Sequence, residues 1–178
     1  MALKSTLKKS LVALTAVGML SSLSACGLGG DSSASSDQSS DTVNIGVLYP
    51  KTGQYAEYGK MFQQGLDLAV EKVNKDGGVQ GKKLGLKYFD TQSDPKQSAS
   101  VAPKIASDSS IVAVVGDYSS GSSMAASPTF QQAGLVHYGF NNSAADFTST
   151  GDHVWTPQYS QDDFQAQTAD MVAENAKK

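Results

Sequence analysis

The chain has 178 residues, with 14 lysines and no arginine against 17 aspartates and glutamates, and a single cysteine. Nucleic-acid binding relies on clustered Lys and Arg that neutralise phosphates, so a net acidic chain with no basic cluster argues against a nucleic-acid partner. One cysteine excludes an internal disulfide, and no His, Cys or Asp group has the spacing of metal ligands.

The first 25 residues have the pattern of a signal peptide. Lys4, Lys8 and Lys9 give a positive start, and a ten-residue apolar run, LVALTAVGML, follows at Leu11–Leu20. A membrane-spanning helix needs roughly 20 such residues, so the short run indicates an export signal rather than a membrane span. We therefore expect residues 1–25 to be removed on export.

The end of this signal indicates a lipid anchor. The segment LSAC at 23–26 places a small residue before the only cysteine, and Gly27 follows. This pattern is typical of a bacterial lipobox, in which the thiol is acylated and the chain is cut before the cysteine. We predict that Cys26 is lipidated and holds the protein on the extracytoplasmic face of a membrane, either at a Gram-positive surface or in a periplasm. The alternative is an ordinary signal peptide with an incidental cysteine.

Residues 26–41 predict a disordered spacer. The stretch GLGGDSSASSDQSSD at Gly27–Asp41 holds one bulky apolar residue in fifteen. Such a segment cannot bury enough apolar surface to offset its conformational entropy. The residues from Thr42 onward are enough for one domain with a hydrophobic core, and the spacer would hold that domain close to the membrane.

From Thr42 onward, short apolar strands alternate with amphipathic helices. Asp94 is expected to cap the second helix, which can begin at Pro95 because proline lacks only an N–H that would be unpaired there. The predicted strands are Val43–Tyr49, Leu84–Phe89, Ile111–Val115, Leu135–Phe140 and His153–Trp155. The predicted helices are Tyr58–Lys75, one from Pro95, one between the Ser119–Ser123 turn and Gly134, and one from Gln161 with Ser160 and Asp163 as a capping box.

This alternation predicts an α/β fold in three layers, a parallel sheet with helices on both faces. The continuous apolar run IVAVV at Ile111–Val115 is typical of a strand that is covered on both faces. Ligands of such folds bind beyond the carboxyl ends of the strands, where helix N-termini point outward. Three of the four turns at those ends are rich in hydroxyl and amide groups, which favours a binding site over a nucleophile with its base.

A series of short motifs runs through nearly all of Val43–Lys178. They are NIGV at Asn44–Val47, Thr52-Gly53, Tyr58-Gly59, NKDGG at Asn74–Gly78, Asp90, DPKQ at Asp94–Gln97, Val115-Gly116, Ser119-Ser120 and Gly134. Each motif alone is unspecific. In this order and spacing, and behind a lipobox and spacer, they resemble the branched-chain amino acid binding proteins of ABC transporters, which belong to the type I periplasmic binding proteins.

The resemblance implies a two-lobed receptor rather than an enzyme. Such a receptor closes on a small solute, here a branched-chain amino acid or a related small amide, and presents it to a membrane permease. It is expected to be a monomer without a cofactor or metal. Residues 42–160 would form the first lobe, and residues 161–178 would form the first helix of the second lobe.

The resemblance also assigns ligand-binding residues. Ser120, beside Ser119, matches a serine whose hydroxyl and nearby backbone N–H groups bind the ligand carboxylate. A helix N-terminus is independently a suitable anion site, although simple helix capping is the alternative. Asn141 and Ser143 match positions that meet the ligand ammonium through a backbone carbonyl and a hydroxyl. Tyr58 matches an aromatic residue lining the cleft, or it packs at the first turn of its helix.

The sequence departs from the family in two respects. Asn141 stands where a small residue is usual, so the pocket is expected to be narrower or more polar. Ser93 and Ser119 occupy the places of a disulfide that often links the loops after the second and third strands, so that bridge is absent.

The last helix has no expected partner. Its inner face, Phe164, Met171 and Val172, would have no sheet to pack against, and no further strand precedes the end at Lys178. We therefore expect a truncated product or a fragment of a longer gene, which lacks most of the second lobe.

Two other functions stay open from the residues alone. One is a ligand-sensing receptor domain of the same fold, and the other is a tethered enzyme of the α/β hydrolase-like or flavodoxin-like class. The sequence contains no Gly-x-Ser-x-Gly elbow, phosphate loop or dinucleotide fingerprint. His137 and His153 are interpreted as structural histidines.

Overall fold

The computed structural model describes residues 41–176, so the predictions for the signal peptide, for Cys26 and for nearly all of the spacer lie outside the described residues. Five strands form one parallel sheet in the order β2-β1-β3-β4-β5. The strands are β1 (Thr42–Tyr49), β2 (Lys83–Asp90), β3 (Ile111–Val115), β4 (Val136–Tyr138) and β5 (Val154–Trp155). The helices are α1 (Ala56–Lys75), α2 (Pro95–Ala106), α3 (Ser120–Gln132), a short 3₁₀ helix η1 (Phe147–Thr150) and α4 (Gln161–Ala176).

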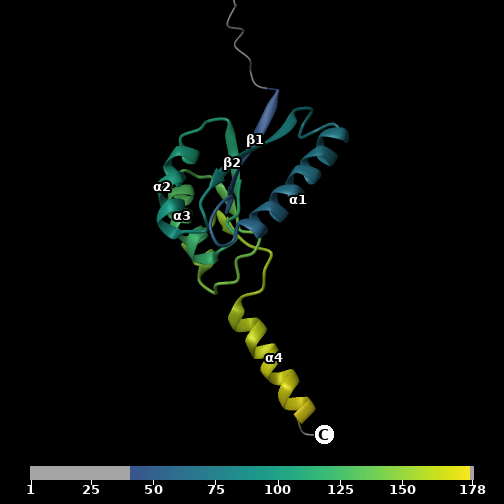
Figure 1. Cartoon of the computed structure of the whole chain (residues 1–178), viewed down its shortest axis with the longest axis vertical. Coiled ribbons are helices and arrows are strands. Elements are labelled where there is room, and N and C mark those ends of the chain that lie inside the picture. The colour runs from purple at the N-terminus through teal and green to yellow at the C-terminus, as the bar shows by residue number, and fades with distance from the viewer. Residues whose placement is uncertain (1–40, 177–178) are drawn as a thin grey trace, which may run out of the picture. The chain divides into compact units, whose positions relative to one another are not determined.

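The three-layer α/β prediction is confirmed. Figure 1 shows α2 and α3 on one side of the sheet and α1 on the other. Strand β3 has the predicted bounds, whereas β4 is shorter than the predicted Leu135–Phe140. Leu135 still belongs to the turn that closes α3, because its N–H donates to the Phe130 carbonyl at 3.0 Å. Gly139 and Phe140 already belong to the loop that follows β4.

The helix starts follow their local chemistry. Asp94 caps α2 as predicted, since its side chain accepts from the Gln97 N–H at 2.9 Å and Pro95 is the first helical residue. At the start of α4, the Ser160 hydroxyl accepts from the Asp163 N–H at 3.1 Å and donates to the Asp163 carboxylate at 2.6 Å. In a capping box the third helical residue usually accepts from the backbone N–H of the cap residue. Here the Asp163 carboxylate accepts from the Ser160 hydroxyl instead.

The hydrophobic core lies between the sheet and the α2–α3 pair. It is built from fully or almost fully buried side chains of β1, β3, α2 and α3: Leu48, Ala102, Ile105, Ile111, Val114, Ala126 and Phe130. Each such side chain contributes roughly 1.5–3 kcal/mol when it is buried. This layer holds the carboxyl ends of β1 and β3 in fixed positions.

The opposite face of the sheet is covered only in part. Helix α1 packs on β2, where the Asn74 side chain bonds both the N–H and the carbonyl of Leu84, at 2.7 and 2.9 Å. Beyond α1, the β3 residue Val112 is 54% exposed. The expectation that β3 is covered on both faces is met only in part, because Ala113 and Val115 are half-buried whereas Val112 is exposed.

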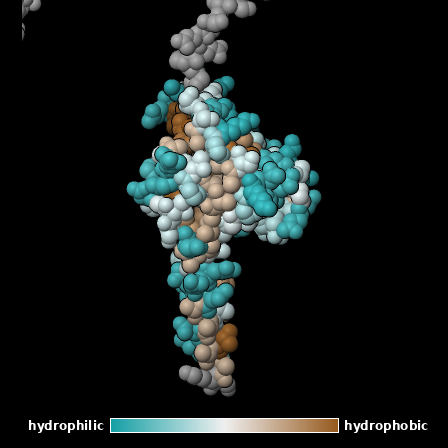
Figure 2. Space-filling view, turned by 90° about the vertical axis from the view of Figure 1, so that its left-hand side faces the viewer, coloured by the Kyte–Doolittle hydropathy of each residue, from teal (hydrophilic) through white to brown (hydrophobic). Residues whose placement is uncertain are grey.

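Helix α4 is exposed along its whole length. Phe164, Met171 and Val172 are 65%, 57% and 58% exposed, as expected for a helix without a sheet to pack against. Figure 2 shows hydrophobic surface along this helix. Among residues 41–176, none of the helices is both long and apolar enough to span a bilayer.

Candidate functional site

The candidate site lies at the carboxyl edge of the sheet, where β1, β3 and β4 end and where α1 and α3 begin. All five predicted ligand-binding residues lie at this edge, on segments that follow β1, β3 and β4, and all five are at least partly accessible. They are Tyr58, Ser119, Ser120, Asn141 and Ser143. The parallel sheet thus brings together residues that are up to 85 positions apart in the chain.

The N-terminus of α3 offers unpaired hydrogen-bond donors. Ser119 is the N-cap residue, but its side chain makes no capping hydrogen bond. Within the described part of the chain, the backbone N–H groups of Ser120, Gly121 and Ser122 have no acceptor. Three free N–H groups at the positive end of a helix suit a carboxylate ligand.

The loop after β4 closes on the start of α3. The Ser120 hydroxyl accepts from the Ala144 N–H at 3.4 Å, and the Ser143 carbonyl accepts from the Gln161 N–H at 2.7 Å. The Asn141 side-chain oxygen accepts from Gln158 at 3.4 Å. Ser120 therefore faces the loop that holds Asn141 and Ser143.

Aromatic rings cover the site beside α1. The Tyr58 ring stacks on Tyr118, with centroids 4.5 Å apart, and Tyr55 lies 4.9 Å from Tyr118. Phe62 approaches Phe140 at 4.4 Å. Burial, and after it the neighbouring Tyr58, raises the pKa of Tyr118, so its hydroxyl stays protonated at neutral pH. Tyr58 packs on Tyr118 at the first turn of α1 and is 46% exposed. The packing role is therefore observed, and the role of Tyr58 in lining the ligand cleft stays a prediction.

A buried carboxylate lies directly behind the α3 N-terminus. Asp117 follows β3 and is fully buried, and its carboxylate accepts from the hydroxyls of Thr91 and Ser93 in the loop after β2. It also accepts from the Ser122 hydroxyl at 3.0 Å and from the Ser119 N–H at 3.4 Å. Ser93 and Ser119, the positions predicted to lack a disulfide, are thus joined through this carboxylate.

A second carboxylate ties the loop after β1 to the end of β2. Asp90 accepts from the N–H groups of Lys51 and Thr52 at 3.0 and 3.3 Å, and from the Thr52 hydroxyl at 2.7 Å. Burial alone would raise the pKa of Asp90, but these hydrogen bonds and one from the Gln92 N–H outweigh it and lower the pKa. Between this loop and Ser119 lies a polar groove of about 690 Å³.

His137 joins β4 to α3 and to the end of β3. Its Nε2 lies 2.6 Å from the Gly116 carbonyl oxygen and its Nδ1 lies 3.0 Å from the Ser127 hydroxyl. Burial lowers its pKa to about 4 against the opposing effects of Gly116 and Asp117. At neutral pH the ring is therefore uncharged, donating to Gly116 and accepting from Ser127, which is a structural role.

Sequence reasoning missed Asp117 and Tyr118. The signal for Asp117 was present, because an acidic residue that directly follows a buried apolar strand needs several donors to be tolerated. Of the serines around it, Ser119 and Ser122 were interpreted through helix capping and ligand binding, and Ser93 was interpreted as the place of an absent disulfide. Tyr118 gave no pattern of its own, because its partners Tyr55 and Tyr58 lie some sixty residues earlier.

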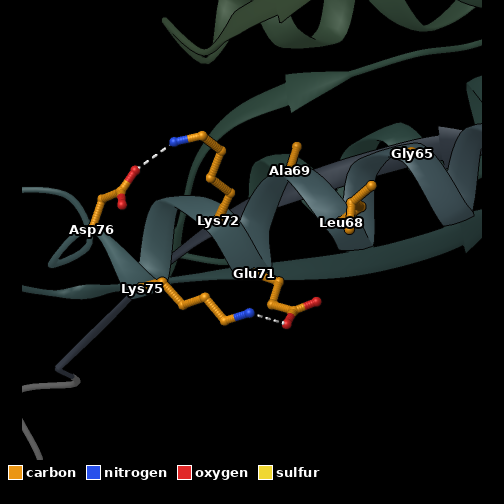
Figure 3. Close-up of a pocket in the computed structure, with 7 residues that line it drawn as sticks. All are labelled: Gly65, Leu68, Ala69, Glu71, Lys72, Lys75 and Asp76. Carbon is orange, nitrogen blue, oxygen red and sulfur yellow. Dashed lines mark hydrogen bonds and ion pairs between the residues drawn. The ribbon is translucent and has the colours of Figure 1, made fainter.

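A second pocket lies on the surface of α1, away from the candidate site. Figure 3 shows a shallow depression on the outer face of α1, which is flanked by the exposed ion pairs Lys72–Asp76 (2.7 Å) and Glu71–Lys75 (2.6 Å). None of the predicted site residues lines it. Within residues 41–176, no group of three or more His, Cys, Asp or Glu side chains is arranged to hold a metal ion.

Curated relatives are amino acid binding proteins. The leucine-, isoleucine-, valine-, threonine- and alanine-binding protein of Pseudomonas aeruginosa is 36% identical over 118 residues, which are 66% of this chain and 31% of that protein. Leu/Ile/Val-binding protein homolog 3 of Brucella melitensis is 34% identical over 136 residues, which are 76% of this chain and 37% of that protein. The chain thus spans about a third of the length of these relatives.

Solved structures of similar proteins share the fold. An ABC transporter substrate-binding protein from Desulfitobacterium hafniense in complex with leucine superposes with a TM-score of 0.68 at 33% identity, covering 75% of this chain and 39% of that one. A branched-chain amino acid transporter substrate-binding protein of Streptococcus pneumoniae in complex with isoleucine gives 0.63 at 29% identity, covering 67% and 34%. The family model described as periplasmic binding protein matches residues 42–178. The chain belongs to the periplasmic binding protein family.

Proposed function

We propose that this protein is a solute-binding protein of an ABC transporter and not an enzyme. Its ligand is an amino acid, with a branched-chain amino acid as the first candidate, or a related small amide. Family membership over residues 42–178 and relatives named for leucine, isoleucine and valine support this assignment. The polar, hydroxyl-rich edge of the sheet supports binding rather than bond-making chemistry.

The observation that carries the proposal is the arrangement around the α3 N-terminus. Free N–H groups at Ser120, Gly121 and Ser122 suit the ligand carboxylate, and the Ser120 hydroxyl lies beside them. Asn141 and Ser143, on the adjoining loop, supply oxygen atoms for the ligand ammonium. The stacked rings of Tyr58 and Tyr118 then provide apolar surface for the ligand side chain.

The rest of the transport assignment follows from the sequence. Lipidation of Cys26 would keep the protein at the extracytoplasmic face of a membrane, within reach of the permease that takes the ligand from it. The protein would act as a monomer in this role. Mass spectrometry of the mature N-terminus tests the anchor, which requires a diacylated or triacylated Cys26.

Titration of the purified chain with leucine, isoleucine, valine and acetamide, followed by amide NMR, tests the binding assignment. We expect the amide signals of Ser120 and Gly121 to shift on adding a branched-chain amino acid. A chain whose amide signals at residues 119–122 stay unchanged at millimolar concentrations of all four compounds would refute the assignment.

Ser120 provides a sharper test. Removal of a hydroxyl that bonds a charged group costs about 1.5–3 kcal/mol, so Ser120→Ala should weaken leucine binding tenfold or more. Ser100, an exposed serine of α2, gives the matched control, and Ser100→Ala should leave the affinity unchanged. Equal affinities of the two variants would leave Ser120 without a role in binding.

A further inference from the structure

The carboxylate of Asp117 is fully buried beside the candidate site. Its exposed fraction is 0%, and no ion pair with a Lys or His side chain is recorded for it within residues 41–176. Hydrogen bonds alone compensate the charge. A buried carboxylate can persist in this way when several donors converge on it, and it is then costly to disturb.

The donors come from two loops and one helix. Thr91 and Ser93 belong to the loop after β2, the N–H groups of Tyr118 and Ser119 belong to the loop after β3, and Ser122 lies in the first turn of α3. The backbone of Asp117 extends the same network, because its N–H donates to the Ser123 hydroxyl at 2.7 Å. Its carbonyl also accepts from Asn142 in the loop after β4, at 3.3 Å.

This distribution divides the donors at the α3 N-terminus into two sets. The N–H groups of Tyr118 and Ser119 donate to Asp117. Those of Ser120, Gly121 and Ser122 have no acceptor among residues 41–176. The hydrogen bonds from Tyr118 and Ser119 to Asp117 therefore fix the direction in which the free N–H groups of α3 point. The carboxylate does not face the groove itself, so it has no contact to offer a ligand.

We infer that Asp117 is the positioning residue of the candidate site. Its carboxylate holds the loop after β2 against the loop after β3 and the first turn of α3, and thereby aims the free N–H groups of α3. The inference rests on the proposed function for its ligand, but the ordering of the loop can be measured without one.

The network predicts different results for two substitutions. In Asp117→Asn, one amide oxygen can still accept from the backbone. The Thr91 hydroxyl can turn fully to the Tyr49 carbonyl, 3.2 Å away, and the Ser122 hydroxyl can turn to Ser98, so both hydroxyl oxygens can accept from the new amide group. In Asp117→Ala, every hydrogen bond to the side chain of residue 117 is lost, and only its backbone bonds to Ser123 and Asn142 remain.

The experiment compares the full chain with Asp117→Asn, Asp117→Ala and Asp108→Asn. Asp108 accepts from Lys87 and Ser110 at the other edge of the sheet, so its substitution weakens a carboxylate network away from the site. Two quantities are measured well below the melting temperature. One is the hydrogen-exchange protection of the Tyr118 and Ser119 amides relative to the β1 amides, and the other is leucine affinity by NMR titration.

We expect Asp117→Ala to lower the hydrogen-exchange protection of the Tyr118 and Ser119 amides at least tenfold. It should also lower the affinity for leucine at least tenfold. Asp117→Asn should stay within threefold of the wild type in protection and bind leucine equally or more tightly, because a negative charge near the ligand carboxylate is gone. Asp108→Asn should change neither quantity. Should Asp117→Ala fail to fold, Ser93→Ala removes one donor only and is expected to reduce both quantities in the same direction.

Three results would overturn the inference. The first is wild-type protection and affinity in Asp117→Ala, or in Ser93→Ala where the alanine variant does not fold. The second is an Asp117→Asn variant that loses as much as Asp117→Ala, which would assign the effect to charge rather than to position. The third is an equal loss in Asp108→Asn, which would make the effect general. A wild-type chain without leucine binding would instead refute the proposed function, and the exchange measurement would still decide whether Asp117 orders the loop.

Discussion

Protonation of His137 should destabilise the domain at mildly acidic pH. The ring is buried edge-on between Phe130 and Phe147, with centroids 5.1 and 5.7 Å away, and its folded pKa of about 4 lies below the value of 6.5 for a free histidine. The folded state therefore favours the neutral ring, so this contribution to stability is complete above pH 6.5 and is lost as the pH falls towards 4. The loss amounts to about 2 kcal/mol at pH 5 and about 3 kcal/mol at pH 4.

Urea denaturation at pH 7, 6 and 5 measures this loss, because Asp90 and Asp108 have lowered pKa values and stay ionised in that range. The variant His137→Gln cannot titrate, so its free energy of unfolding should vary much less with pH, whatever its value at pH 7. The partly exposed His153 gives the control, and His153→Gln should retain the wild-type slope. A wild-type slope in His137→Gln would refute the reasoning.

Two further predictions concern α1 and are read from thermal and urea denaturation. A Cβ atom at Gly59 would lie 2.0 Å from the Pro50 carbonyl oxygen, so Gly59→Ala should destabilise the domain by about 1–3 kcal/mol. Gly65→Ala, in the same helix with no atom within 4 Å of the new Cβ, should instead stabilise it by about 0.5–1 kcal/mol; the same sign for both would contradict the steric argument. Asn74→Ala removes two hydrogen bonds to Leu84 and should cost about 2 kcal/mol, and a cost near zero would show that water replaces them.

Local signals predicted most of the fold. The bounds of β3 and the capping of α2 by Asp94 were both readable, because a strand of apolar residues and an Asp-Pro pair at a helix start are properties of neighbouring residues. The exposure of Val112 could not be predicted from the sequence around it. Its sequence is that of a covered strand, and whether a helix lies over it depends on residues far away in the chain.

The candidate site was predicted less completely. Ser120, Asn141 and Ser143 were placed through a resemblance, and the structure puts Ser120 at the start of α3 and the other two on the adjoining loop after β4. Asp117 escaped notice because its role depends on donors from Thr91 and Ser122, which meet only after the sheet has formed. A residue that bonds several loops leaves no pattern among its neighbours in the sequence, whereas a residue that caps a helix does.

The pairing of β1 with a strand on each side has a consequence for folding. This first strand is paired on both sides, and the hydrogen bond from Asn44 to Ser110 spans 66 residues. Non-local pairings form slowly, because the entropy of closing a long loop is lost before any contact compensates it. A chain emerging from its N-terminus must therefore keep Val47 and Leu48 exposed until β3 has appeared. That delay keeps the chain unfolded for longer, which would suit export if the predicted signal peptide directs it.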